Sequence, residues 1–155
     1  MPDEALEVAL RALGRRERSR VELARWLADR GIAEEDVEQT LAQLEELGEL
    51  DDARFAGRYA EDKRELAGWG AERIRGALLE RGVAPEHIDA ALAADGATEQ
   101  TERAAALLVR RGQALESEGD RGRALGYLTR KGYPYEIAHD AIRSVERASE
   151  RPPGR

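Results

Sequence analysis

The sequence lacks cysteine altogether and has few aromatic side chains, which make up 5% of its 155 residues. Without cysteine the fold contains no disulfide and no thiolate metal site, as is common in a reducing compartment. No apolar run approaches the ~20 residues that a membrane-spanning helix requires. The first residues, Met1-Pro-Asp-Glu, lack the basic start and apolar core of a signal peptide. We therefore expect a cytoplasmic protein with no membrane partner.

Patterns that carry chemistry are also missing. The chain has no glycine-rich phosphate loop, no zinc-ligand pattern and no nucleophile elbow. His87 and His139 stand far apart in the sequence with no third ligand at metal spacing, so both are expected on the surface. Asp51 and Asp52 precede a helical pattern, where carboxylates are preferred as caps rather than as a catalytic pair. We predict a protein that is not an enzyme, with no catalytic, cofactor-binding or metal-binding residues and no cofactor.

Charge is abundant but unevenly distributed. Charged residues make up 37% of the chain and the net charge is −7, which argues against simple DNA binding. Residues 1–50 carry 7 basic and 13 acidic side chains, and residues 51–97 carry 7 and 10. Residues 98–155 carry 11 and 9, so this third meets least repulsion from a polyanion.

The feature that organises the chain is a segment repeated three times around a glycine. Gly31, Gly82 and Gly132 follow one another at intervals of 51 and 50 residues. In each copy a leucine stands four residues before the glycine, a cation directly precedes it, and apolar residues follow at six and ten positions. A glycine at this place ends a helix in a left-handed turn. A fixed period of this length is typical of a repeat protein.

Helical periodicity and caps predict three helices in each copy. Ser19 and Glu22 form a capping box at the start of one helix, and no window alternates with the period of a strand. The helices are expected at about 5–13, 20–31, 34–47, from 51–52 to the break at 68–70, 71–81, from 85 to a linker at 93–98, 99–111, 121–131 and 135–147. A loop is expected at 112–119. We predict an all-α fold of three tandem three-helix repeats with helix-turn-helix-like units. The repeats cover 1–50, 51–97 and 98–148, form an elongated, curved array, and precede a disordered tail at 149–155.

One ordered set of residues resembles a known family. It comprises Leu50 to Ala56 (Leu-Asp-Asp-Ala-Arg-Phe-Ala), Tyr59, Arg64, Gly68, Gly70, Arg73, Ile74, Leu78, Gly82 and Val83. The segments 16–23 and 127–134 fit the same pattern. Together they resemble the RecX regulatory family over roughly residues 6–145. Ala71 departs from the pattern, because the family often has proline there, and affects only a helix start.

The resemblance implies a regulator of the bacterial recombinase RecA. Such a protein binds the filament of RecA on single-stranded DNA and inhibits its recombinase, ATPase and co-protease activities, which modulates DNA repair and the SOS response. The implied partners are the RecA nucleoprotein filament and, more weakly, single-stranded DNA, and the chain is expected to be a monomer. Two alternatives remain open: a helix-turn-helix-like DNA-binding protein that acts through its C-terminal repeat, and a structural adaptor that binds neither RecA nor DNA.

Two groups of residues are candidates for contact with these partners. Trp69 lies between two glycines and either wedges between repeats or stands exposed as an anchor. Phe55 and Tyr59 lie on one helical face, where core packing is favoured over a partner contact. The expected RecA-binding residues are Arg54, Arg58, Arg64, Trp69 and Arg73, and the expected contacts to the DNA backbone are Arg110, Arg111, Arg121, Arg123, Arg130 and Lys131.

Overall fold

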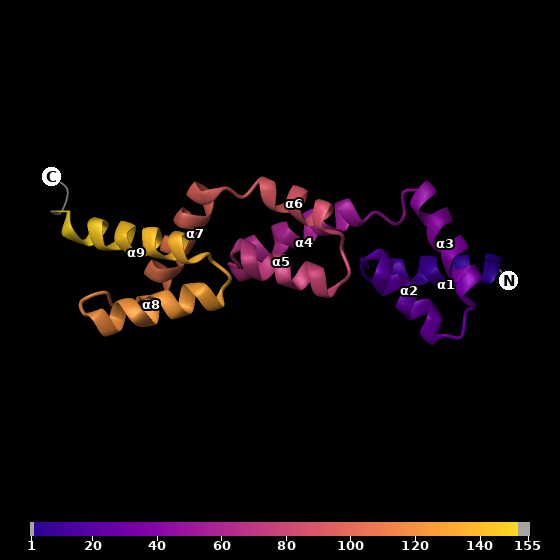
Figure 1. Cartoon of the computed structure of the whole chain (residues 1–155), viewed down its shortest axis with the longest axis horizontal. Helices are drawn as coiled ribbons and strands as arrows, with labels where there is room; N and C mark the ends of the chain where they lie inside the picture. The colour runs from indigo at the N-terminus through magenta and orange to yellow at the C-terminus, as the bar shows by residue number, and fades with distance from the viewer. Residues whose placement is uncertain (1, 152–155) are drawn as a thin grey trace. The chain divides into compact units, whose positions relative to one another are not determined.

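The computed structural model describes residues 2–151, and within them it contains nine α-helices and no strand (Figure 1). The all-α prediction is confirmed. None of the helices in this range is long and apolar enough to cross a bilayer. The helices are α1 (Pro2–Arg15), α2 (Arg20–Asp29), α3 (Glu34–Glu46), α4 (Asp52–Ala67), α5 (Ala71–Glu80), α6 (Pro85–Ala93), α7 (Ala97–Arg111), α8 (Glu118–Arg130) and α9 (Tyr135–Glu150).

The three predicted glycine turns have the same geometry. Gly31, Gly82 and Gly132 have φ angles of 82°, 81° and 101°, in the region that only glycine adopts without strain. The N–H of the next residue donates to the carbonyl of the repeat leucine at 3.3, 3.1 and 3.1 Å. This bond and a second one from the glycine N–H define a Schellman motif. The repeat leucines are fully buried, so each turn also fixes a core side chain.

Several helices extend beyond their predicted ends, among them α1, which spans Pro2–Arg15 where 5–13 was predicted. The start of α8 at Glu118 lies three residues before the prediction because Ser117 and Asp120 form a capping box there, and the predicted loop at 112–119 is correspondingly shorter. At the other end, α9 continues to Glu150. Residues 149 and 150 of the expected disordered tail are therefore helical, while 152–155 lie outside the described residues. The predicted link at 93–98 is also shorter, because α7 begins at Ala97.

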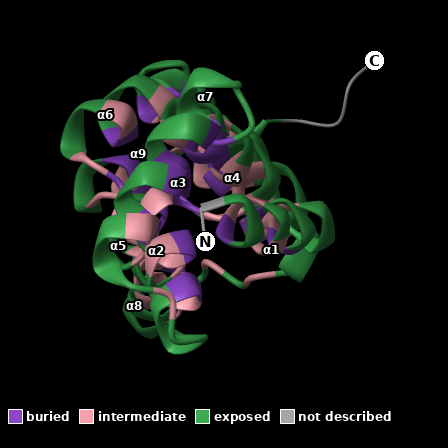
Figure 2. Ribbon diagram, turned by 90° about the vertical axis from the view of Figure 1, so that its right-hand side faces the viewer, coloured by how far each residue is buried: buried purple, intermediate pink, exposed green. Residues whose placement is uncertain are grey.

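The chain divides into two compact units, which we describe separately. The first unit comprises Met1–Tyr59 and Ala77–Ala91, and the second comprises Ala60–Gly76 and Leu92–Arg155. Parts of α4, α5 and α6 thus belong to each. Buried positions recur at helical spacing, so the helices have a buried side and an exposed side, as expected for amphipathic helices (Figure 2). The first core includes Leu23, Leu27, Leu41 and Leu44; the second includes Leu108, Leu128, Tyr133 and Ile142.

Each unit contains one close contact between a helix start and a glycine turn. In the first unit the Ser19 hydroxyl donates to the Arg81 carbonyl at 2.6 Å. In the second unit the Gly70 N–H donates to the Lys131 carbonyl at 2.8 Å. Ser19 and Gly70 occupy the same position in successive repeats, since they lie 51 residues apart. The last carbonyl before each of these glycine turns is therefore satisfied by the start of the second helix of the preceding repeat.

Alanine substitution at two equivalent glycines distinguishes the stability lost through backbone strain from the stability lost through overpacking at the close contact. Gly31 and Gly82 share nearly the same φ, but a Cβ at Gly31 meets open space, whereas one at Gly82 lies 2.6 Å from the Cβ of Val21. We expect Gly31→Ala to lower the free energy of unfolding by about 1 kcal/mol through backbone strain. Gly82→Ala adds overpacking and lowers it by about 3 kcal/mol. Urea denaturation followed by circular dichroism measures both; equal losses would show that the contact contributes nothing.

Candidate interaction sites

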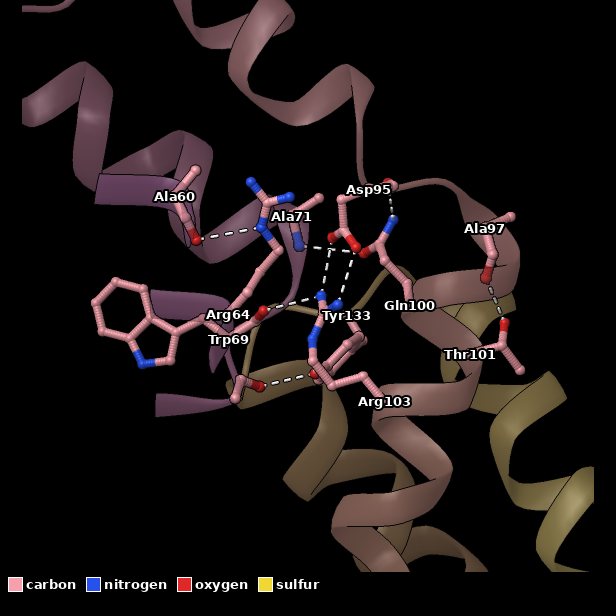
Figure 3. A network of polar contacts seen from close by, with 11 residues as sticks. Ala60, Arg64, Trp69, Ala71, Asp95, Ala97, Gln100, Thr101, Arg103 and Tyr133 are labelled. Carbon is pink, nitrogen blue, oxygen red and sulfur yellow. Dashed lines mark hydrogen bonds and ion pairs between the residues drawn. The ribbon is translucent and has the colours of Figure 1, made fainter. Parts of the chain in front are cut away.

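A buried polar network in the second unit fixes the turn that carries Trp69 (Figure 3). The Arg103 guanidinium of α7 donates to both carboxylate oxygens of Asp95, at 2.9 and 2.8 Å. It also donates to the Trp69 carbonyl at 3.2 Å and to the Tyr133 hydroxyl at 3.0 Å. The Tyr133 hydroxyl in turn donates to the Gly68 carbonyl at 2.8 Å. The turn between α4 and α5 is thus held through its own backbone.

The ionisation of these groups follows from their burial and pairing. The Asp95 side chain is only 3% exposed, which places this ion pair in a site of low polarity. Burial alone lowers the pKa of Arg103, but its hydrogen bonds with Asp95 and the proximity of Tyr133 raise that pKa overall. Burial raises the pKa of Tyr133, so its hydroxyl stays protonated and available as a donor at neutral pH.

Further backbone contacts hold the same turn from the other side. Gly68 has a φ of 67°, and the N–H of Ala71 donates to the Gln100 side chain at 3.1 Å. A Cβ on Gly70 would lie 2.5 Å from the carbonyl of Gly132, so only glycine fits there. The N–H of Glu72 donates to the same carbonyl at 3.0 Å. The Gly68-Trp69-Gly70 segment is therefore a rigid turn.

The Trp69 ring is held by cations and points away from the Arg103 network (Figure 3). The guanidinium carbon of Arg73 lies 4.1 Å from the ring centroid and the Lys63 ammonium lies 4.7 Å from it. The ring is half-buried and Arg73 is exposed. These three side chains, Lys63, Trp69 and Arg73, form what we call the Trp69 platform. Tryptophan and arginine are enriched among the residues that contribute most to protein binding, so the platform is a candidate interaction site.

The structure assigns the five predicted RecA-binding residues to different units. Trp69 and Arg73 lie together, and Arg64 lies in the same unit on α4, where its Nε donates to the Ala60 carbonyl at 3.2 Å. Arg54 and Arg58 belong to the first unit, and Arg58 forms an ion pair with Glu17 at 2.5 Å. Sequence reasoning missed Lys63, although it stands six residues before Trp69.

The aromatic and acidic residues near Arg54 have structural roles. Phe55 is 6% exposed, so its predicted core packing is confirmed, while Tyr59 is half-buried and its ring lies 4.9 Å from the Arg81 guanidinium. Asp51 caps α4, since its carboxylate accepts from the Arg54 N–H at 3.1 Å. Asp52 instead accepts from the Arg20 N–H at 2.8 Å and caps α2. Burial raises the pKa of Asp52.

Three of the six predicted DNA-backbone residues line one groove of about 450 Å³ in the second unit. Arg111, Arg123 and Arg130 form its rim together with Gln113, Gly119, Gly122 and Gly126. The glycines lie three and four residues apart, so they share one face of α8. We call this the α8 groove.

The other three predicted DNA-backbone residues lie outside the α8 groove lining. Arg121 forms ion pairs with Glu146 at 3.5 Å and Glu118 at 3.8 Å. The Lys131 ammonium donates to the Ala67 carbonyl at 3.0 Å, and Arg110 is exposed on α7. No group of three or more His, Cys, Asp or Glu side chains within residues 2–151 is arranged to hold a metal ion.

Comparison with known proteins assigns the family. Residues 5–44 match the first three-helix domain of RecX and residues 51–92 match the second. A curated relative from Mycolicibacterium vanbaalenii, "Regulatory protein RecX", is 35% identical over 96% of this chain and 85% of its own length. The chain belongs to the RecX family. A Thermus thermophilus relative with the same name is 35% identical over 97% of this chain and 98% of its own length.

Solved RecX structures share the fold. The crystal structure of RecX from Lactobacillus salivarius has a TM-score of 0.85 at 20% identity and covers 94% of this chain and 96% of its own. A second crystal structure of regulatory protein RecX has a TM-score of 0.79 at 25% identity, covering 92% of this chain and 71% of its own. As a member of the RecX family, the chain is a regulatory protein and not an enzyme.

Removing the charge of Arg103 is expected to destabilise the second unit. Arg103→Leu leaves the buried Asp95 carboxylate without a partner and is expected to lower the free energy of unfolding by about 3 kcal/mol. The control Arg110→Leu, on the exposed face of the same helix, is expected to change it by less than ~0.5 kcal/mol. In a double-mutant cycle, Asp95→Leu with Arg103→Leu should cost less than the sum of the single changes. Additive costs in urea denaturation would contradict a direct pairing.

Proposed function

We propose that this chain binds the RecA filament on single-stranded DNA and inhibits the recombinase, ATPase and co-protease activities of RecA. Through this inhibition it modulates DNA repair and the SOS response. Family membership over nearly the whole chain carries the proposal. The residues add a mode of action, because a regulator that binds a filament needs recognition surfaces and no reaction centre.

The Trp69 platform is the surface that we propose meets RecA. Its backbone is held by Arg103 and Gly132, so little conformational entropy is lost when a partner binds. Its ring offers apolar area, while Arg73 offers an exposed charge to a carboxylate of the partner. Arg64 lies on α4 in the same unit and is included in the proposed contact zone. Arg54 and Arg58, in the first unit, form a separate part of the proposal.

The experiment that tests the function is the ATPase activity of RecA from the same source, measured on single-stranded DNA while this protein is titrated in. Inhibition at well below one molecule per RecA supports the proposal and favours action at filament ends. No inhibition at stoichiometric excess would overturn it.

Charge reversal on the platform is expected to weaken this inhibition. Arg64→Glu combined with Arg73→Glu introduces repulsion from acidic partner groups and removes one cation from the Trp69 ring. We expect the concentration for half-inhibition to rise by about tenfold, equivalent to ~1.4 kcal/mol. The matched control, Arg143→Glu with Arg147→Glu, makes the same charge change on exposed α9 positions of the same unit. If both pairs of substitutions raise the concentration for half-inhibition equally, the effect comes from net charge and not from the platform.

The α8 groove favours a second, weaker activity: contact with the backbone of single-stranded DNA. A Cβ at Gly122 would meet nothing within 4 Å, so the fold does not require glycine there. Glycine in a helix interior costs about 1 kcal/mol relative to alanine. The Arg123 and Arg130 guanidinium groups lie over this glycine face, with Nη1 3.4 Å from a Cβ placed on Gly119 and 3.1 Å from one placed on Gly126. They offer two cations to a phosphate chain.

The salt dependence of DNA binding tests the α8 groove. We expect Arg123→Gln with Arg130→Gln to remove two phosphate contacts, which lowers the slope of log affinity against log salt by about 1.4 for a single strand. Fluorescence anisotropy of a labelled oligothymidylate measures the slope. Arg143→Gln with Arg147→Gln, which removes the same charge outside the groove, should leave the slope unchanged. If both pairs lower the slope equally, the groove is not the site.

A further inference from the structure

A hollow of about 170 Å³ opens beside the Trp26 indole in the first unit. Residues of α1 line one wall of this hollow, and their spacing of three and four positions places them on one face of that helix. Trp26 of α2 and Arg30, the C-cap residue of that helix, form the opposite wall. The lining is Val8, Arg11, Ala12, Arg15, Trp26 and Arg30.

The fold of the repeat does not require a large ring at position 26. Trp26 directly precedes the buried Leu27, and the matching residue in the middle repeat, before Leu78, is Ala77. That repeat forms the same glycine turn with an alanine in this place. Trp26 itself is only half-buried. The third repeat has Tyr127 at this place. One side of Trp26 packs against the first core, and the remainder of the ring is available for a partner.

The hollow lies within a strongly basic stretch of an otherwise acidic region. Residues 11–30 carry seven basic and three acidic side chains, whereas residues 31–50 carry seven acidic and no basic ones. Arg11 pairs only weakly with Glu7, at 3.9 Å and with both side chains largely exposed. Within residues 2–151, Arg15 and Arg30 form no ion pair with a carboxylate. The positive charge around Trp26 is therefore largely uncompensated.

Arg18 lies among other cations beside Trp26. Its guanidinium lies 5.4 Å from the Trp26 ring centroid and donates to the Ala12 carbonyl. Burial lowers the pKa of Arg18, and the neighbouring Arg16, Arg15 and Arg30 lower it further, against the opposing effect of Glu22. An anion placed here would relieve repulsion among side chains that already face one another.

We infer that this hollow binds an acidic peptide segment of a partner protein, with one apolar side chain of the peptide against Trp26 and its flanking carboxylates on Arg11, Arg15 and Arg30. An apolar cavity of ~150 Å³ accepts a group as large as benzene. The hollow therefore has room for one aliphatic or aromatic side chain between Val8, Ala12 and the indole. Arginines at its rim can then pair with carboxylates in bidentate geometry.

Two observations favour an acidic peptide over a nucleic acid strand. First, the Arg30 guanidinium lies 3.5 Å from the Trp26 ring centroid and already covers one ring face, which limits base stacking. Second, α3, with six of the seven acidic residues of 31–50 within it, packs against α1 in the same core. A long polyanion that continued past the hollow would meet this negative charge, whereas a short peptide motif ends before it.

The two tryptophans of the chain allow a direct test. The full chain, labelled with ¹⁵N, gives one indole signal each for Trp26 and Trp69, and Trp69→Phe identifies which is which. The probe is a short peptide with a central leucine flanked by aspartates. We expect the Trp26 signal to shift on titration while the Trp69 signal stays in place. A peptide with serine instead of leucine should bind about tenfold more weakly, and a peptide with lysines should not bind.

A charge-reversal pair then locates the contact. Arg15→Glu is expected to weaken peptide binding by about tenfold, whereas Arg25→Glu, an exposed α2 position outside the hollow lining, should change it less than about twofold. The inference fails if the acidic peptide leaves the Trp26 signal unchanged, or if both variants weaken binding equally. It also fails if oligothymidylate shifts the Trp26 signal and the peptide does not. None of these measurements contains RecA, so their outcome is independent of the proposed function.

Discussion

The close approach of a helix start to a glycine turn is the contact on which the rest of the structure depends. Val21 lies against Gly82, and Gly70 lies against Gly132, at distances that leave no room for a Cβ. In the first case a serine hydroxyl satisfies the exposed turn carbonyl, and in the second a backbone N–H does so. The repeats conserve the acceptor and its geometry while the donor changes. A glycine that ends a helix in one repeat is thus also the docking point for the preceding repeat.

The second of these contacts holds the backbone that carries Trp69, the side chain that we propose meets RecA. Because Gly70 is docked on the Gly132 turn, Tyr133 reaches back to Gly68 and Arg103 reaches the Trp69 carbonyl. The backbone of the turn is therefore fixed from two sides, whereas the Trp69 ring is contacted by the cations of Lys63 and Arg73. A rigid main chain with a partly exposed ring lowers the entropic cost of binding, because only the partner needs to be ordered.

Local patterns made most of the fold predictable, and long-range contacts explain what was not. The Schellman turns and the Ser19 capping box follow from residues within one helical turn of each other. The start of α8 was placed too late because Gly119 and Gly122 weaken the helical pattern, although Ser117 and Asp120 carried the capping signal. The pairing of Arg103 with the Trp69 carbonyl joins residues 34 positions apart, and no periodicity encodes it. Two of the three platform residues, Trp69 and Arg73, were predicted as contact residues, whereas Lys63 was not, since it resembles any solvated helix residue.

The net charge of −7 does not indicate which partners this protein can bind, because its basic and acidic side chains are gathered in separate short stretches. At 0.15 M salt the Debye length is about 8 Å, so the electrostatic interaction of a partner is mainly with the charged side chains close to its contact. Exposed charges farther away are largely screened. Around Trp26 those side chains are arginines, and along the α8 groove they are Arg111, Arg123 and Arg130. The same acidic chain can therefore approach anionic partners at separate places. In the first unit, the acidic side chains of α3 act against a long polyanion near Trp26, which favours a short acidic segment of a partner there.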